Sequence, residues 1–223
     1  DNFATGKREV VPELPGLTVK EGSIFDQALV NACFAQFRPE VVSFHFGLPA
    51  PGLLDRVKAA GAKVVSSATT ADEARWLEDH GADAIIAQGY EAGGHRGIFL
   101  TDDLANQPGL FALLPQVVDA VEVPVIAAGG IADARGVAAV RALGASAAAV
   151  GTAFLLADEC PVSGAYRSAL QAGASHETVL TQAFSGRWAR GLANRFTRET
   201  DALVARGELP DFPIPNALTR PLR

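Results

Sequence analysis

Short apolar runs alternate with amphipathic stretches through the middle of the chain. Runs rich in small and β-branched residues favour strands buried on both faces, whereas apolar residues spaced three and four apart favour helices with one buried side. The strands predicted in this way span residues 40–46, 62–67, 82–87, 124–128 and 147–151. Because helical patterns separate these strands, the sequence predicts βα units around a parallel sheet.

The predicted helices follow the same alternation. They span residues 23–37, 51–60, 71–80, 111–118 and 133–143. Thr70 and Glu73 occupy the capping-box positions at the start of the helix at 71–80. Beyond Thr152 the alternation stops, and we predict further helices at 165–171 and 189–204, followed by an extended proline-rich tail.

Two strand ends have the composition of phosphate-binding loops. Gly129 and Gly130 follow the strand at 124–128, and Gly151 and Thr152 end the next strand. Where a strand gives way to a helix, free backbone N–H groups can bind a phosphate. Two consecutive loops of this kind are typical of strands seven and eight of a TIM barrel, and no Rossmann fingerprint follows any strand. The α/β chain is therefore predicted to be a (β/α)8 barrel rather than an open doubly wound sheet.

Counting back from these loops makes the visible strands numbers four to eight of the barrel. Strands one to three would precede Asp1, which agrees with the absence of methionine, so we expect a part of a longer protein. The predicted organisation is a partial barrel domain at 1–160, a mostly helical cap segment at 161–210 and a tail at 211–223.

The segment Q-G-Y-E-A-G-G-H-R-G at residues 88–97 is the strongest candidate site. It follows the buried strand at 82–87, and its glycines allow the backbone to approach a flat ligand closely. His95 can exchange protons near neutral pH, which makes it the candidate catalytic residue. Gln88 either hydrogen-bonds the edge of a ring system or caps its own loop. Glu91 and Arg96 flank the glycines and are able to pair with each other.

Three further polar residues have weaker signals. His45 lies near the end of the strand at 40–46, where it belongs either to a pocket or to the core. Thr152 and Ser185 both have hydroxyl groups suited to phosphate binding, but only Thr152 stands at a strand end. No metal-ligand cluster and no nucleophile elbow is present in the sequence.

Composition narrows the class of partner. A net charge of −6 with only four lysines argues against nucleic acid and anionic membranes as partners. The apolar stretch at 123–157 is interrupted by charges, so no membrane span is expected. Residues 1–22 do not have a signal-peptide pattern, and Cys33 and Cys160 match no metal or redox spacing. These features favour a cytoplasmic protein that acts on a small molecule.

With these residues in view, the chain resembles the nitronate monooxygenase family, formerly called 2-nitropropane dioxygenases, over residues 38–200. The residues that show the resemblance are 43–47 (S-F-H-F-G), 88–97, 125–132, 150–153 (V-G-T-A) and 184–187 (F-S-G-R). The A-G-G-H core with the upstream Gln88 is the specific part, because glycine phosphate loops occur in many FMN barrels.

The resemblance implies a TIM-barrel enzyme with non-covalent FMN and a helical cap. It implies that His95 is catalytic and that His45 lines the substrate pocket. The flavin-binding residues implied are Gln88, Gly93, Gly94, Gly129, Gly130, Ala149, Val150, Gly151 and Thr152. The family oxidises alkyl nitronates, such as propionate 3-nitronate, with dioxygen and releases nitrite and a carbonyl product. Two alternatives remain: an FMN-dependent NAD(P)H reductase of quinones or enoyl thioesters, and an inactive barrel fragment or non-catalytic binding protein.

Overall fold

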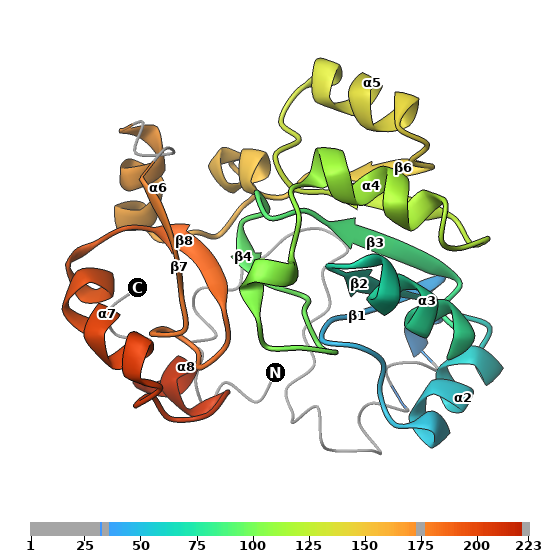
Figure 1. Ribbon diagram of the computed structural model, residues 1–223, viewed down its shortest axis with the longest axis horizontal. Coiled ribbons are helices and arrows are strands. Elements are labelled where there is room, and N and C mark those ends of the chain that lie inside the picture. Colours follow the sequence, from blue (N-terminus) through green and yellow to red (C-terminus); the bar gives the residue numbers. More distant parts are fainter. Residues whose placement is uncertain (1–31, 33–35, 173–176, 220–223) are drawn as a thin grey trace.

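A five-stranded parallel sheet is the centre of the computed structural model, which describes residues 32, 36–172 and 177–219 (Figure 1). Its strands are β1 (Val41–Phe44), β2 (Lys63–Ala68), β3 (Ala84–Gln88), β5 (Val125–Ala128) and β6 (Ala147–Ala149). They are ordered β1-β2-β3-β5-β6, and every neighbouring pair is parallel. The predicted strands and the parallel α/β class are confirmed, whereas closure into an eight-stranded barrel stays a prediction.

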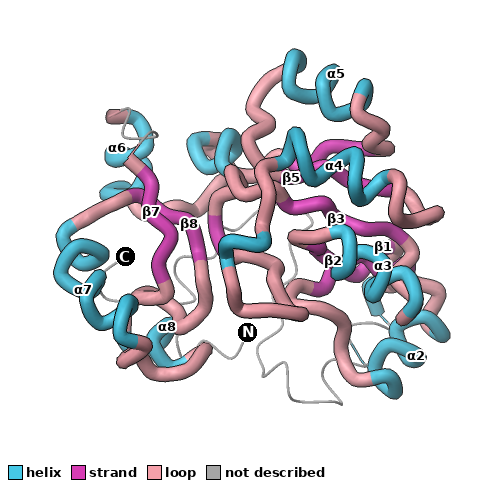
Figure 2. The backbone as a smooth tube through the Cα atoms, in the orientation of Figure 1, coloured by secondary structure: helices cyan, strands magenta, loops and turns pink. Residues whose placement is uncertain are grey.

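One face of this sheet is covered by the helices that connect the strands (Figures 1 and 2). These are α2 (Pro51–Ala59), α3 (Ala71–Asp79), α4 (Leu110–Val118) and α5 (Ala134–Ala142). All four were predicted from the apolar spacing. The helix predicted at 23–37 lies almost entirely outside the described residues.

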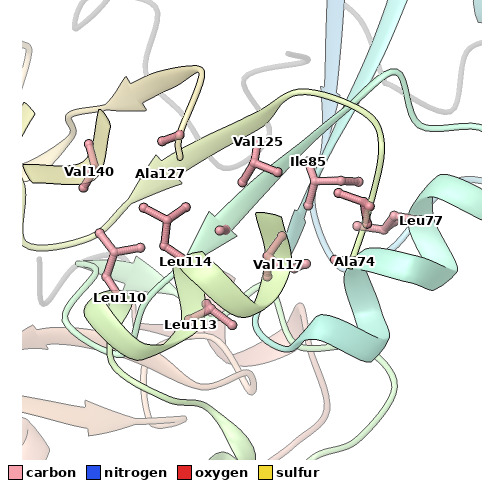
Figure 3. Packing of buried hydrophobic residues seen from close by; sticks show 14 of the residues in the cluster. Ala74, Leu77, Ile85, Leu110, Leu113, Leu114, Val117, Val125, Ala127 and Val140 are labelled. Atoms are coloured by element: carbon pink, nitrogen blue, oxygen red, sulfur yellow. The ribbon is translucent and has the colours of Figure 1, made fainter. Parts of the chain in front are cut away.

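The main hydrophobic core lies between the sheet and these helices. Figure 3 shows Ile85 and Val125 of the sheet against Leu77 of α3 and Leu114 and Val117 of α4. Burial alternates along β5, where Val125 and Ala127 are buried and the two residues between and after them are only half-buried. Alternate side chains of a strand point to opposite faces, so the helix-covered face is the more deeply buried one.

A second, smaller sheet is antiparallel and was not predicted. It consists of β4 (Gly94–His95), β8 (Ala189–Leu192) and β7 (Thr178–Thr181), in the order β4-β8-β7. The helix predicted at 189–204 is therefore wrong over its first residues. The helix α7 (Arg195–Arg206) begins only after Asn194, whose side chain accepts a hydrogen bond from Thr197 N in a capping box. Such a cap fixes the helix start, which leaves the preceding residues to pair as a strand.

Several shorter elements complete the described chain. The 3-10 helices η2 (Leu104–Asn106) and η3 (Thr152–Leu156) follow β4 and β6, and α6 (Gly164–Gln171) agrees with the predicted helix at 165–171. The tail was predicted to be extended, but it contains the helix α8 (Ile214–Leu218). The residues after Thr152 thus mix helices with strands, and the division at residues 160 and 210 stays a prediction.

Candidate active site

His95 is held at the junction of the two sheets. It lies in β4, directly opposite Ala189 of β8, and its Nε2 is 2.7 Å from the hydroxyl of Ser185. That hydroxyl also lies 3.2 Å from the carbonyl of Arg187, to which it can donate. A serine hydroxyl has a single proton, so when Ser185 donates it to Arg187, Nε2 of His95 must itself donate to Ser185. The serine thus fixes the orientation of the imidazole and favours a proton on Nε2.

The Gln88 side chain fastens the segment that contains His95. Its Nε2 donates to the carbonyl of His95 at 2.9 Å, and its Oε1 accepts from Gly97 N at 2.7 Å. Both ends of the buried amide therefore contact its own loop, as in the capping alternative. A contact between Gln88 and a flavin stays a prediction.

His45 lies beside His95, immediately after β1. Its Nε2 is 3.3 Å from the carbonyl of His95, and its Nδ1 is 3.0 Å from the hydroxyl of Ser67. Because a carbonyl only accepts, Nε2 carries the proton and Ser67 donates to Nδ1. Burial lowers the pKa of His45, and the charges of Arg96 and Arg187 lower it further against the opposing effect of the carbonyl. His45 is thus a neutral neighbour of the candidate site that stays exposed to solvent.

Arg96 shapes the glycine loop from inside. Its guanidinium donates to the carbonyls of Gly89, Tyr90, Ala92 and Gly94, and only 1% of the residue is exposed. No carboxylate among the described residues forms an ion pair with it; the expected partner, Glu91, instead accepts from Leu110 N. Burial lowers the pKa of Arg96 to about 10, so the group still carries its charge at neutral pH. The loop is therefore wrapped around a buried positive charge.

Glu73 connects the loop after His95 to helix α3. Thr70 caps the helix as predicted, with its hydroxyl accepting from Glu73 N. The Glu73 carboxylate does not complete a capping box, because it accepts from the backbone N and hydroxyl of Thr69 and from the N–H groups of Phe99 and Leu100. All four partners lie within 3.1 Å, and Glu73 is fully buried. The carboxylate therefore fixes the path of the chain beyond Gly97.

The predicted cofactor-binding loops meet at the ends of β3, β5 and β6. A Cβ atom added to Gly93 would lie 2.6 Å from the Thr152 hydroxyl, and one added to Gly129 would lie 3.1 Å from Ala92 N. Real Cβ atoms do not show the first distance and rarely show the second, so the two glycines allow the close approach of these loops. Three strand ends that are separate in the sequence thus form one surface.

The source of phosphate donors after β5 differs from the prediction. Asp133 caps helix α5, and its carboxylate accepts from the N–H groups of Arg135 and Gly136. These first-turn donors are already satisfied, so the helix N-terminus is not the free donor group that was predicted. After β6 the chain forms η3 rather than an α-helix. Any phosphate donors would come from the loops themselves, at Gly129, Gly130 and Thr152.

An aromatic cluster adjoins His95. The ring of Phe46 lies 5.9 Å from that of His95, and the ring of Phe212 lies 6.1 Å from it. Phe46 and Phe212 are 5.8 Å apart, and the guanidinium of Arg187 lies 4.2 Å from the centre of Phe46. Phe46 has a left-handed backbone with φ of 68°, a conformation that bulky residues rarely adopt outside constrained sites.

Sequence reasoning did not identify Ser185, Arg187 or Phe212 as neighbours of His95. Ser185 was noted only as a phosphate-donor type without context, and Phe212 was placed in an extended tail. The segment F-S-G-R was a recognisable signal, since it belongs to the family resemblance. Its contact with His95 spans 90 positions and depends on the unpredicted sheet.

Other features of the described chain lie away from this cluster. A cavity of about 390 Å³ does not include His95, and its lining residues are Tyr90, Glu91, Leu104, Ala105, Gln107 and Gly109. We centre the site on His95, because the side chains of His45, Gln88 and Ser185 all contact it. Within residues 36–172 and 177–219, no group of three potential metal ligands occurs and no helix is long and apolar enough to cross a membrane.

Comparison with known proteins identifies the family. The model of the nitronate monooxygenase family matches residues 2–223. The probable nitronate monooxygenase of Staphylococcus aureus strain Newman is 47% identical over 184 residues, covering 82% of this chain and 51% of that protein. The relative from strain JH9 is 46% identical over the same length. The chain thus spans about half the length of these curated relatives.

Solved structures agree with this result. The nitroalkane oxidase from Streptomyces ansochromogenes has a TM-score of 0.78 and 44% identity, over 88% of this chain and 56% of that one. FabK from Thermotoga maritima has a TM-score of 0.68 and 38% identity, over 81% of this chain and 55% of that one. The resemblance inferred from the sequence is confirmed: this chain belongs to the nitronate monooxygenase family.

Proposed function

We propose that the protein oxidises alkyl nitronates, such as propionate 3-nitronate, with dioxygen and with FMN as cofactor, giving nitrite and a carbonyl product. The main support is the placement of His95, whose imidazole is fixed by Ser185 beside a glycine loop that meets the ends of β5 and β6. Closure of the sheet into a TIM barrel belongs to the same proposal.

The residues present fit a flavin. The close approach of Gly93 to Thr152 and of Gly129 to Ala92 brings the loops together, and Gly94 and Gly151 on these loops have open space where a Cβ atom would stand. Gly93 and Gly94 would lie against the ring system, with Gln88 nearby. Gly129, Gly130 and residues 149–152 would hold the phosphate end. When bound, FMN supplies electron acceptance and reactivity toward dioxygen.

The protein's own groups would bind and orient the substrate. A nitronate is an anion, and the His95 imidazole in its protonated form can attract it by its charge. His45 stays neutral and donates Nε2–H to the His95 carbonyl, which fixes the backbone at that position. The rings of Phe46 and Phe212 would exclude water on the side of His95 that they cover.

The direct test measures oxygen uptake and nitrite release when propionate 3-nitronate is added to the FMN-loaded protein. We expect turnover, and we expect His95→Asn to abolish most of it while retaining FMN. His80→Asn is the matched control, because His80 stacks on Trp76 at the end of α3 and is not part of the site. Absence of turnover, or full activity of His95→Asn, would contradict the proposal.

The structural likeness to FabK supports the alternative of an FMN-dependent NAD(P)H reductase. The loops predicted to bind FMN would serve both reactions. Anaerobic addition of NADH separates the two, since rapid bleaching of the flavin absorbance supports the reductase. A protein that takes up no FMN at all would support the non-catalytic alternative.

A further inference from the structure

The guanidinium of Arg187 lies next to the candidate site. Its side chain forms no hydrogen bond or ion pair with the described residues, and it contacts the rings of Phe46 at 4.2 Å and Phe212 at 5.5 Å. Neighbouring arginines behave differently. Arg96 donates to four carbonyls, and Arg190 donates to the Tyr90 carbonyl and the Thr178 hydroxyl.

The backbone of Arg187 is held by the same group that holds His95. The Ser185 hydroxyl accepts from Arg187 N at 3.3 Å while it contacts Nε2 of His95. Gly186 has φ of 85°, and a Cβ at this position would lie 2.6 Å from Phe212 N. The turn therefore brings Arg187, Phe212 and His95 together, and the contacts of Ser185 and Gly186 fix the position of Arg187.

The chemistry of this arrangement favours a second anion. Stacking on an aromatic face uses the flat side of the guanidinium and leaves the N–H donors in its plane available. Those donors match a carboxylate, which they can bind through two parallel hydrogen bonds. His95 and Arg187 both pack against Phe46 and Phe212, so two anion-binding groups face one small aromatic cluster.

We propose that Arg187 binds a carboxylate at the end of the substrate remote from the nitronate, and so determines specificity for carboxylate-bearing over neutral-tailed nitronates. The proposal rests on the proposed function, in which His95 receives the nitronate. We expect the bound group to be a carboxylate because Arg187 alone can offer a guanidinium fork to it. The neighbouring Arg96 and Arg190 donate hydrogen bonds to backbone carbonyls of the protein.

The kinetic test compares propionate 3-nitronate with propyl 1-nitronate, in which a methyl group replaces the carboxylate. In Arg187→Gln, kcat/KM for the carboxylate substrate should fall about 10- to 100-fold, the range expected for losing a charge-assisted hydrogen-bonding partner. The value for propyl 1-nitronate should change little. Arg75→Gln is the matched control, since Arg75 pairs with Asp72 on the surface of α3. Equal losses for both substrates, or no loss for either, would overturn the assignment.

A binding measurement separates this proposal from the proposed function. Isothermal titration of 3-nitropropionate into the FMN-loaded protein should show weaker binding to Arg187→Gln than to the unaltered protein and the Arg75→Gln control. This result would support the role of Arg187 even if neither nitronate were turned over. Unchanged affinity would refute it.

Arg187→Lys covers the case in which the glutamine variant does not fold or retain FMN. Lysine keeps the charge but not the fork, so we expect an intermediate loss of 3-nitropropionate affinity. Affinity as tight as that of the unaltered protein would show that the fork does not bind the carboxylate.

Discussion

At the scale of single residues, the candidate site depends on side chains that fix the position of His95. Ser185 orients the imidazole of His95, Gln88 fastens the backbone on both sides of it, and His45 donates to its carbonyl. Arg96 gives the glycine loop its shape from within. These contacts fix the backbone and the ring of His95, and we assign His95 and Arg187 to the substrate because both lie against the aromatic rings of Phe46 and Phe212.

Replacing Ser185 by alanine should lower kcat for nitronate oxidation by about 10- to 100-fold, because an imidazole without its partner loses orientation and a preferred site for its proton. The pH profile of kcat should also shift, an effect that loss of folding alone would not produce. Ser168→Ala, on helix α6, is the control. An unchanged kcat and pH profile in Ser185→Ala would show that the serine does not orient His95.

The lowered pKa of His45 predicts a pH dependence of stability. The folded protein disfavours protonated His45, so the unfolded chain binds more protons at low pH. Stability should be complete above the ordinary pKa of 6.5 and should decline as the pH falls through the lower pKa of the folded state. Urea unfolding between pH 5 and 7.5 should give a flatter profile for His45→Gln than for the unaltered protein. Parallel profiles would show that His45 does not titrate differently on folding.

At the scale of elements, the sequence predicted best what local patterns determine. The parallel strands and their helices follow from apolar spacing, since each buries its own face in one core. The strands β4, β7 and β8 were missed because they are short, and short antiparallel strands take their stability from pairing with distant partners. For the same reason His95 and Gln88 were identified from one continuous segment, whereas Ser185, Arg187 and Phe212 were not.

Glu73 lies in the first turn of helix α3, as predicted, but the role of its carboxylate was not predicted. Glu73→Gln should destabilise the protein by about 2 to 4 kcal/mol, because an amide NH2 would face N–H donors in a buried place. Amide exchange at Phe99 and Leu100, which now donate to the carboxylate, should accelerate. Asp72→Asn, in an exposed pair with Arg75, should cost less than about 1 kcal/mol in the same denaturant measurement. Similar losses for both variants would contradict the assigned role of Glu73.

At the scale of the whole molecule, the described chain places its candidate site at one end of the parallel sheet. The helices cover one face, and the loops after β3, β5 and β6 meet where the strands end. Parallel strands all point the same way, which is why the sequence could predict that these loops converge. It could not predict the antiparallel sheet that reaches across to His95, because that contact joins segments with no shared periodicity.

Binding of FMN should stabilise the whole fold. If the cofactor binds only the folded chain, free FMN at 100 times its Kd should add about 2.7 kcal/mol to the free energy of unfolding. Thermal denaturation at increasing FMN concentration should therefore show a rising Tm, with riboflavin raising it less because it lacks the phosphate. A Tm that does not respond to FMN would contradict the proposed cofactor site.

The bond between His95 and Ser185 also has a consequence during synthesis. Ser185 follows His95 by 90 positions, so at roughly 5 to 20 residues per second it is added at least about 4 seconds later. During that interval β4 has no β8 to pair with, and the imidazole has no hydroxyl to orient it. A nascent chain can therefore form the parallel sheet before Ser185 is available to orient His95.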